Sequence, residues 1–316
     1  MSDSNVSILR LGTRASLLAR TQSRIVADAL ERAHSGLKVE LIPFSTSGDQ
    51  ITDRPLHEVG GKGLFTRELE LALLEERVDF AVHSFKDLPT TQPLVDQSAL
   101  IVAAVPQRED PRDVLVCASA GTIDTLPAKA VVGTGSLRRR CQLLSRRPDL
   151  QIMPIRGNID TRLRKQREGQ FAAVVLAHAG LRRAGLFDAR TMAVLDPSDL
   201  LPAPGQGALA LQCRREDQRT QSLLMAIHHS DTALCVAAER ELVMLLNGDC
   251  LSPIAALATI QGEELSLSAT VGWRSGHPPL LCAGGTSARS DPNAAARAAY
   301  DALARQGVMA ALHGET

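Results

Sequence analysis

Short apolar segments alternate with amphipathic helical segments along most of this chain. Apolar runs that predict strands occupy Val6–Leu11, Lys38–Phe44, Val78–Val82, Ala99–Val105, Val114–Ala118, Ala130–Gly133, Gln151–Ile155, Phe171–Ala177 and Gly207–Cys213. Helical patterns cover Leu17–His34, Leu64–Arg77, Leu137–Arg146, Ile159–Arg167 and Ala179–Ala184. Alternation of this kind favours α/β domains, because a helix between two strands carries the chain back across the sheet.

The final third of the chain has a different pattern. A long helix runs from Ser230 or Asp231 to about Asn247, and an Ala-rich helical pattern covers Ala294–Leu312. Between them, Leu265, Leu267, Ala269 and Val271 alternate with polar residues, as on a half-exposed antiparallel sheet. The pattern predicts a small C-terminal α+β domain.

Two segments that lack helix and strand patterns divide the α/β region. The charged run Arg108–Asp113 and the Pro-rich run Pro202–Gly205 are candidate crossings between domains. The strand at Gly207–Cys213 could return to the first sheet. We therefore predict a discontinuous domain 1 (residues 1–105 and 206–226), a domain 2 inserted into it (108–203) and a domain 3 (229–316). Two crossings make two hinged α/β domains with mixed sheets, like periplasmic binding proteins, with a cleft between them.

The overall composition is that of an ordinary globular protein with no net charge. The chain has 316 residues, 35 Lys and Arg against 35 Asp and Glu, and eight aromatic residues. These numbers argue against binding to nucleic acid or to a membrane surface. Six cysteines without CxxC spacing suggest free thiols in a reducing compartment and no metal site. No signal peptide or membrane span is recognisable, so we expect a cytoplasmic protein. Separately, we expect it to be a monomer.

Polar side chains follow the buried strand at Val78–Val82 at once. His83, Ser84, Lys86 and Asp87 come next, and Pro89 ends the segment. In open α/β sheets, ligands bind outside the carboxyl ends of the strands, so Ser84, Lys86 and Asp87 are candidates for chemistry. The alternative for this segment alone is a solvated turn with a local Lys–Asp pair. We interpret His83 as a structural histidine at the end of the strand.

Positive charge is concentrated between Arg138 and Arg183. This region has twelve basic residues against three acidic ones, whereas from Ser230 onward five arginines face nine acids. Such a basic domain in a neutral protein predicts an anion site. The segment Gly133–Ser136 links a strand to a helix N-terminus, whose free N–H groups favour anions. The arginines near strand ends are the candidates to bind the anion: Arg138, Arg139, Arg156, Arg162 and Arg183. Five other arginines of the region are interpreted as a solvated face: Arg140, Arg146, Arg147, Arg164 and Arg167.

One cysteine has an unusual position. Cys250 follows Asn247, Gly248 and Asp249 in a loop between a helix and a strand, where a thiol could reach a cleft. An inert loop thiol is the alternative. The other cysteines are predicted to be small core side chains: Cys117, Cys141, Cys213, Cys235 and Cys282.

A series of short motifs occurs in a fixed order along the chain. They are GTRAS (Gly12–Ser16), GGKGLF (Gly60–Phe65), AVHSFKDLP (Ala81–Pro89), REDPRD (Arg108–Asp113), GTGSLRR (Gly133–Arg139), RRPDL (Arg146–Leu150), IRGNIDTRL (Ile155–Leu163), AGLRR (Ala179–Arg183), PGQGA (Pro204–Ala208) and the Cys250 loop. Together these motifs resemble those of the porphobilinogen deaminase (hydroxymethylbilane synthase) family. The similarity extends from about residue 8 to residue 260 and is weaker in the C-terminal tail.

The resemblance implies three domains and a dipyrromethane cofactor attached through a thioether to Cys250. It also implies a transferase that condenses four porphobilinogen molecules head to tail with loss of ammonia. Hydrolysis then releases hydroxymethylbilane. Asp87 matches the catalytic aspartate. The cofactor and substrate contacts that carry over are Arg14, Ser16, Lys62, Ser84, Lys86, Thr134, Ser136, Arg138, Arg139, Arg156, Arg162, Arg183 and Gln206.

These assignments agree with the chemistry of the residues. Each pyrrole carries an acetate and a propionate, so fixed arginines would offset the charge of a growing chain. A carboxylate can stabilise the electron-poor azafulvene left by ammonia and can transfer protons. A thiolate is the nucleophile needed to form a stable thioether. The glycine-rich segment Ser45–Gly63 is a candidate lid over a growing product, or a disordered loop.

Three positions depart from the family pattern. Gly135 replaces a usual serine, so one hydroxyl contact is lost or replaced by a backbone N–H group. Asp249 replaces a usual glycine, and its charge should disfavour a neighbouring thiolate. Leu17 replaces a common proline, which affects only the start of a helix.

The rival hypothesis is a non-catalytic protein that binds a polycarboxylate on the same scaffold. Such a protein needs neither Asp87 nor Cys250. Binding of nucleic acid by the basic domain is a weaker alternative, because the total charge is zero and aromatic residues are scarce.

Overall fold

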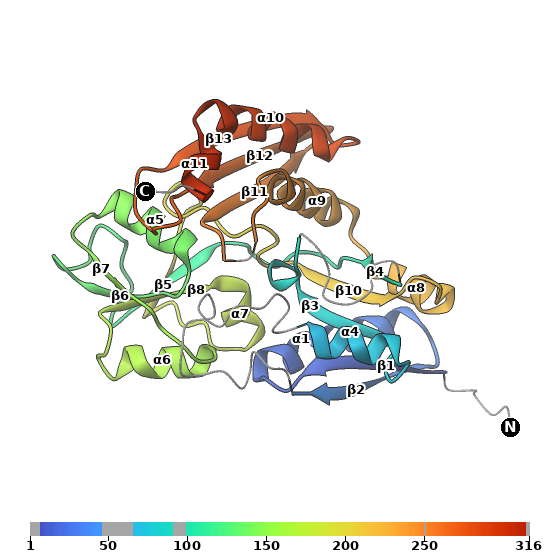
Figure 1. Cartoon of the computed structure of the whole chain (residues 1–316). Helices are drawn as coiled ribbons and strands as arrows, with labels where there is room; N and C mark the ends of the chain where they lie inside the picture. The colour runs from blue at the N-terminus through green and yellow to red at the C-terminus, as the bar shows by residue number, and fades with distance from the viewer. Residues whose placement is uncertain (1–6, 46–65, 91–98, 250, 314–316) are drawn as a thin grey trace, which may run out of the picture. The chain divides into compact units, whose positions relative to one another are not determined.

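The computed structural model describes residues 7–45, 66–90, 99–249 and 251–313 (Figure 1). The chain divides into two compact units. Unit 1 comprises residues 1–108 and 208–233, and unit 2 comprises residues 109–207 and 234–316. Each unit is therefore built from two separate stretches of the sequence.

Unit 1 is organised around a five-stranded mixed sheet with the order β2-β1-β3-β10-β4. Its elements are β1 (Ser7–Arg14), α1 (Leu17–Ala33), β2 (Leu37–Phe44), α4 (Arg67–Leu74), β3 (Phe80–Ser84), the short 3-10 helix η1 (Phe85–Asp87), β4 (Leu100–Ala104), β10 (Leu209–Arg214) and α8 (Gln218–Met225). Strand β1 is parallel to β2 and β3, and β10 is antiparallel to β3 and β4. The carboxyl ends of β1, β2 and β3 therefore lie at one edge.

Both faces of this sheet are covered. Phe80 and Val82 of β3 belong to a core that also contains Val26 and Leu30 of α1. Ala81 points to the other face, where it joins Leu69 of α4 in a second core. Successive side chains of β3 point to opposite faces of the sheet, and each face packs against an apolar core. Phe80, Ala81 and Val82 are therefore all apolar.

The first part of unit 2 is a second five-stranded mixed sheet, with the order β7-β6-β8-β5-β9. Its elements are β5 (Asp113–Cys117), β6 (Val131–Gly133), α5 (Leu137–Arg146), β7 (Gln151–Met153), α6 (Ile159–Arg167), β8 (Ala173–Ala177), α7 (His178–Arg183) and β9 (Met192–Val194). Strand β6 is parallel to β7 and β8, and β5 is antiparallel to β8 and β9. Each sheet thus has three parallel strands, then one antiparallel strand, then an edge strand. The antiparallel strand of the first sheet, β10, comes from far along the chain, whereas that of the second, β5, directly precedes β6.

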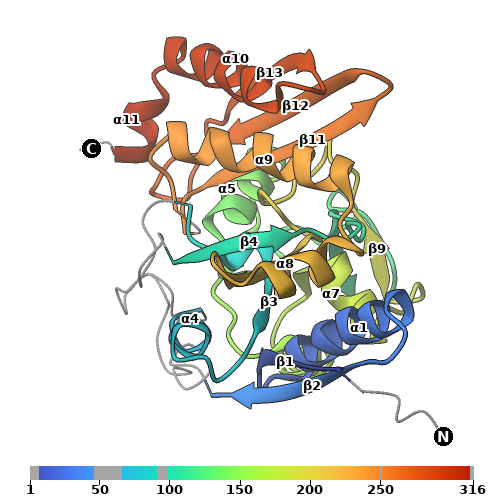
Figure 2. The ribbon, with the colours of Figure 1, turned by 90° about the vertical axis from the view of Figure 1, so that its right-hand side faces the viewer.

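The C-terminal part of unit 2 is a three-stranded antiparallel sheet with helices (Figure 2). Its elements are α9 (Ser230–Leu245), β11 (Ile254–Gln261), β12 (Glu264–Val271), β13 (Leu281–Ala288), α10 (Pro292–Arg305) and α11 (Val308–His313). Leu265 and Leu267 of β12 share a core with Leu242 of α9 and with Ala295 and Ala299 of α10. One face of the sheet therefore carries the core.

The predicted fold class is confirmed in the structure: two α/β domains with mixed sheets, followed by a small C-terminal α+β domain. Two details of the prediction were wrong. The helix expected at Ala294–Leu312 is two helices, because Gly307 between them has a φ of +81°, which ends a helix. Cys282, expected in the core, is exposed, because β13 presents alternate side chains to the outer face. Strand β9 and helix α8 were not predicted.

Candidate functional site

The candidate residues of unit 1 lie at the carboxyl edge of its sheet. Arg14 ends β1 and Ser84 ends the neighbouring parallel strand β3. Ser16 caps helix α1, because its side-chain oxygen accepts a hydrogen bond of 3.4 Å from the backbone N–H of Ala19. The hydroxyl of Ser84 lies 3.3 Å from Nε2 of Gln22 in the same helix. The fold therefore brings Arg14, Ser16 and Ser84 to one edge of one sheet.

The short helix η1 carries Lys86 and Asp87 directly after β3. Its first residue, Phe85, is buried, and the Phe85 N–H donates to the carbonyl of Ala208 at 3.0 Å. Lys86 and Asp87 are half-buried. Within the described part of the chain, the Asp87 carboxylate has no hydrogen-bond or ion-pair partner. A buried phenyl ring thus anchors a turn that leaves a carboxylate available to react.

His83 is the buried neighbour of this turn. Burial lowers its pKa to about 4, a hydrogen bond with Gln212 opposes that change, and the charge of Arg14 adds to it. The imidazole is therefore neutral near pH 7, in agreement with a structural histidine.

The candidate residues of unit 2 follow β6 at the carboxyl edge of the second sheet. The hydroxyl of Thr134 accepts a hydrogen bond of 3.2 Å from the N–H of Ser136. The Ser136 side chain caps α5, accepting from the N–H of Arg139 at 3.5 Å. Gly135 is exposed, and a Cβ atom there would meet only the carbonyl of Ile155, at 3.5 Å. A serine would therefore fit where this chain has glycine.

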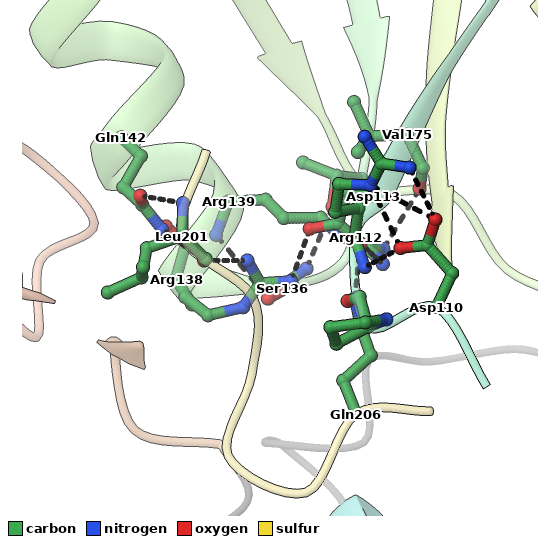
Figure 3. Close-up of polar contacts among 12 residues, drawn as sticks. Asp110, Arg112, Asp113, Ser136, Arg138, Arg139, Gln142, Val175, Leu201 and Gln206 are labelled. Carbon is green, nitrogen blue, oxygen red and sulfur yellow. Dashed lines mark hydrogen bonds and ion pairs between the residues drawn. The ribbon is translucent and has the colours of Figure 1, made fainter. Parts of the chain in front are cut away.

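Arg138 and Arg139 converge on one buried carboxylate, that of Asp113 (Figure 3). Nη2 of Arg138 lies 2.8 Å from Oδ2 of Asp113, and Nη2 of Arg139 lies 2.7 Å from Oδ1. The Nη1 atoms donate to the carbonyls of Leu201 (2.6 Å) and Val175 (2.9 Å). Both arginines are buried, and Asp113 is 0% exposed. Burial alone would raise the pKa of Asp113, but the two guanidinium groups outweigh it and hold that pKa well below its ordinary range.

Gln206 and Arg183 are linked to the same region through the PGQG segment. Nε2 of Gln206 donates to Oδ1 of Asp113 at 2.9 Å and to the carbonyl of Pro111 at 2.7 Å. Nη2 of Arg183 donates to the carbonyl of Gly207 at 2.7 Å. Burial lowers the pKa of Arg183 to about 10, partly opposed by the charge of Glu109, so its guanidinium stays charged near pH 7.

The other predicted arginines are less enclosed. Arg156 and Arg162 are half-buried near the start of α6, and Nε of Arg162 donates to the carbonyl of Gly157 at 2.8 Å. The structure therefore places Arg138, Arg139 and Gln206 around Asp113. Arg156 and Arg162 instead follow the end of the neighbouring strand β7.

Two assigned residues, Cys250 and Lys62, lie outside the described residues, as does most of the predicted lid at Ser45–Gly63. The loop beside Cys250 is described. Oδ1 of Asp249 accepts hydrogen bonds from the N–H of Leu251 (3.0 Å) and from the hydroxyl of Ser252 (2.8 Å). The carboxylate that departs from the family pattern is therefore bound to its own loop.

Asp113 is the member of this site that sequence reasoning missed. It ends the REDPRD run, which the sequence presented as a crossing. An acidic residue at the start of an apolar strand was the available signal, because a carboxylate about to be buried requires a positive partner.

Among the described residues, no helix is long and apolar enough to cross a membrane. Nor does the described part of the chain contain a group of three His, Cys, Asp or Glu side chains that could hold a metal ion.

Solved structures similar to this chain include the periplasmic VFT2 domain of Bordetella pertussis BvgS (16% identity, 70% of this chain and 86% of that chain, TM-score 0.38). The periplasmic aliphatic sulphonate binding protein SsuA from Escherichia coli matches at 17% identity, over 75% of this chain and 70% of that one, with a TM-score of 0.39.

Two family models match most of the chain. One, described as porphobilinogen deaminase, dipyromethane cofactor binding domain, matches residues 9–222. The other, described as porphobilinogen deaminase, C-terminal domain, matches residues 233–278. The first model spans every assigned site residue except Cys250, which lies within the second. The chain therefore belongs to the porphobilinogen deaminase family.

Proposed function

We propose that this hydroxymethylbilane synthase uses Asp87 as its catalytic carboxylate and Cys250 as the attachment point of its dipyrromethane cofactor. The enzyme is a transferase of tetrapyrrole and haem biosynthesis, which condenses four porphobilinogen molecules with loss of ammonia and releases hydroxymethylbilane by hydrolysis. The observation that carries the assignment of Asp87 is the half-buried, unpartnered carboxylate at the end of β3, inside the segment that matches the cofactor-binding model.

A carboxylate in this position suits the chemistry of the substrate. Loss of ammonia from porphobilinogen leaves an electron-poor carbon, and a nearby negative charge lowers the energy of the developing cation. The oxygen atoms of the same carboxylate can accept a hydrogen bond from the pyrrole N–H group. They can also take up a proton and return it. Because Asp87 has no partner among the described residues, its oxygens need not break an existing bond to do so.

The described residues of unit 2 fit an anionic cofactor. Two arginines share the single carboxylate of Asp113, so the buried cluster carries one net positive charge. Nε of Arg139 is buried and has no hydrogen-bond partner in the described part of the chain. Buried charge that is not balanced within the protein favours an anion. The acetate and propionate groups of a dipyrromethane supply such an anion.

We assign the binding of cofactor and substrate carboxylates to residues at the two strand edges. Those of unit 1 are Arg14, Ser16, Ser84 and Lys86; those of unit 2 are Thr134, Ser136, Arg138, Arg139, Arg156, Arg162, Arg183 and Gln206. When bound, the cofactor supplies the pyrrole carbon to which the first substrate is joined. The guanidinium groups hold carboxylates in fixed directions through paired N–H donors, while the hydroxyls of Thr134 and Ser136 add neutral hydrogen bonds.

The proposal also includes Lys62 as a binding residue and Cys250 as the thioether position. These two assignments rest on the sequence motifs alone. The motif GGKGLF supports Lys62 as a contact. The loop thiol of Cys250 supports a thioether, because a thiolate is the soft nucleophile that this bond requires.

We further propose a cytoplasmic monomer that binds neither nucleic acid nor membranes. The zero net charge and the few aromatic residues support the expectation that it binds neither nucleic acid nor membrane surfaces. The domain boundaries that we propose are 1–105 with 206–226, 108–203 and 229–316; the three separate sheets support three domains.

The reaction itself provides the test. Purified protein incubated with porphobilinogen should release four molecules of ammonia for each tetrapyrrole set free. A non-catalytic polycarboxylate-binding protein would bind porphobilinogen and release no ammonia, and that result would refute the assignment.

A further inference from the structure

Asp113 lies at the carboxyl edge of the parallel strands of the second sheet. Ligands of open α/β sheets bind at this edge. It is the first residue of β5, and its Cα pairs with that of Ala177, the last residue of β8. Because β5 is antiparallel to β8, its first residue lies at the carboxyl end of β8 and of the parallel strand β6. Thr134 and Ser136 follow β6 at that same edge. Asp113 is completely buried, Thr134 is nearly so, and Ser136 is half-buried.

Three side chains of the assigned binding set donate to this one carboxylate. Oδ1 accepts from Arg139 (2.7 Å) and Gln206 (2.9 Å), and Oδ2 accepts from Arg138 (2.8 Å). Figure 3 shows the three donors approaching Asp113 from α5 and from the segment that follows Leu201. Each arginine also donates to a backbone carbonyl, so each guanidinium is held at two points.

Stability alone does not explain why charged side chains, and not apolar ones, occupy this position, even though removing only one of them would destabilise the fold. A buried ion pair is often no more stabilising than apolar side chains of the same size, because both charges lose their hydration. Here two positive charges share one negative charge, which is a still poorer balance. What the arrangement supplies is orientation. A free arginine loses rotamer entropy when it binds a ligand, whereas one already held by Asp113 has lost it in advance.

We propose that Asp113 is a positioning residue that orients Arg138, Arg139 and Gln206 toward the carboxylates of the pyrrole chain without touching that chain itself. The proposal rests on the proposed function, because it takes the two arginines and Gln206 as binding residues. It also explains why basic residues occupy the first turn of α5, where the helix dipole disfavours them.

The test compares two neutralised carboxylates in the full-length protein. Asp113→Asn keeps the shape of the side chain and removes its charge. Asp79→Asn is the matched control, since Asp79 is 13% exposed and faces two arginines of unit 1, Arg10 at 2.7 Å and Arg214 at 3.9 Å. For each variant, thermal unfolding, intact mass and the KM for porphobilinogen are measured.

Asp113→Asn should raise KM by about tenfold to a hundredfold, the affinity range of one charge-assisted hydrogen bond. It should also lower the fraction of protein that carries the cofactor mass. Asp79→Asn should lower the unfolding temperature but keep KM within about twofold of the wild type. A folded Asp113→Asn protein with wild-type KM and full cofactor content would overturn the positioning role.

Arg138→Lys and Arg139→Lys separate this proposal from the proposed function. If both lysine variants keep the wild-type KM and cofactor content, the arginines do not bind, and the binding assignments fail together with the positioning role. If they raise KM and Asp113→Asn does not, only the positioning role fails.

A charge-balanced variant covers the case in which Asp113→Asn does not fold. Asp113→Asn combined with Arg139→Gln removes one charge of each sign and so retains the buried net charge. Its KM should exceed that of Arg139→Gln alone, because Arg138 has lost its anchor. Equal KM values for these two proteins would overturn the proposal.

Discussion

Oδ1 of Asp113 accepts a hydrogen bond of 2.7 Å from Nη2 of Arg139, and both side chains are buried. The arginine is thus held by a carboxylate that solvent does not reach. Because Arg138 binds the other oxygen, one aspartate fixes two neighbouring side chains of α5. This relationship has consequences for stability as well as for binding.

Asp113→Asn should destabilise the protein by about 3–5 kcal/mol at pH 7, the usual cost of removing one partner of a buried ion pair. The pKa of Asp113 in the folded protein lies below its unfolded value of about 3.9. Its contribution is therefore fully present above about pH 4 and is lost as the pH falls below that value.

Thermal unfolding between pH 3 and pH 7 measures this contribution. The difference in unfolding temperature between wild type and Asp113→Asn should shrink toward the acid end. Curves that remain parallel down to pH 3 would show that the charge of Asp113 does not stabilise the fold.

His83 should make the stability of the fold depend on pH in a second range, above the one in which Asp113 titrates. Burial lowers its pKa to about 4, whereas the unfolded chain titrates near 6.5. Between these values the unfolded state binds more protons, so stability rises with pH through this range and levels off above about pH 6.5. The total change is roughly 3 kcal/mol.

His83→Gln should flatten the dependence of unfolding temperature on pH between 4 and 6.5. His277→Gln is the control, because His277 is exposed and should leave the dependence as it is in the wild type. An unchanged slope in His83→Gln would mean that the buried imidazole is not the group that titrates.

Asp87→Asn should lower the rate of ammonia release at least about 100-fold while leaving the protein folded. The amide keeps the size of the side chain but can neither stabilise a cation nor accept a proton. Because Asp87 has no partner in the described part of the chain, the unfolding temperature should change little. Asp87→Glu, which keeps the charge, should retain more activity than Asp87→Asn. Near-normal turnover in Asp87→Asn would remove this residue from the mechanism.

Gly207→Ala should destabilise the PGQG segment that carries Gln206. Gly207 has a φ of +87°, and a Cβ atom there would lie 2.3 Å from the carbonyl oxygen of Glu109. The strained backbone costs about 1–3 kcal/mol, and the collision adds to it. Gly169→Ala is the matched control, since its φ is +77° and nothing lies within 4 Å of the added atom. Equal losses of unfolding temperature in the two variants would contradict the close contact at Gly207.

The sequence predicted most elements of the fold because their signals are local. Helix α5 was placed at its observed bounds, Leu137–Arg146, since Ser136 before it is a good cap and apolar residues recur along one face. The three-residue strand β9 (Met192–Val194) was missed, because so short a segment has no periodicity and forms only through its pairing with β5.

The partners of the site residues could not be predicted from the sequence, because they are set by contacts between residues far apart in the chain. The basic first turn of α5 predicted an anion, but it could not reveal that an internal one, Asp113, lies 25 residues before Arg138. That contact exists because β5 enters the second sheet antiparallel to β8, which brings the start of one strand to the end of another. The positions of Thr134, Ser136 and Gln206 at the same edge follow from the same topology.

The intact mass of the purified wild-type protein and of Cys250→Ser tests the central claim most directly. The wild type should exceed its sequence mass by two porphobilinogen units less two molecules of ammonia, and Cys250→Ser should have its sequence mass alone. Both proteins should unfold cooperatively, so that loss of the group is not loss of the fold. A wild-type preparation that turns over porphobilinogen at its unmodified sequence mass, or a Cys250→Ser protein that still carries the added mass, would contradict the account.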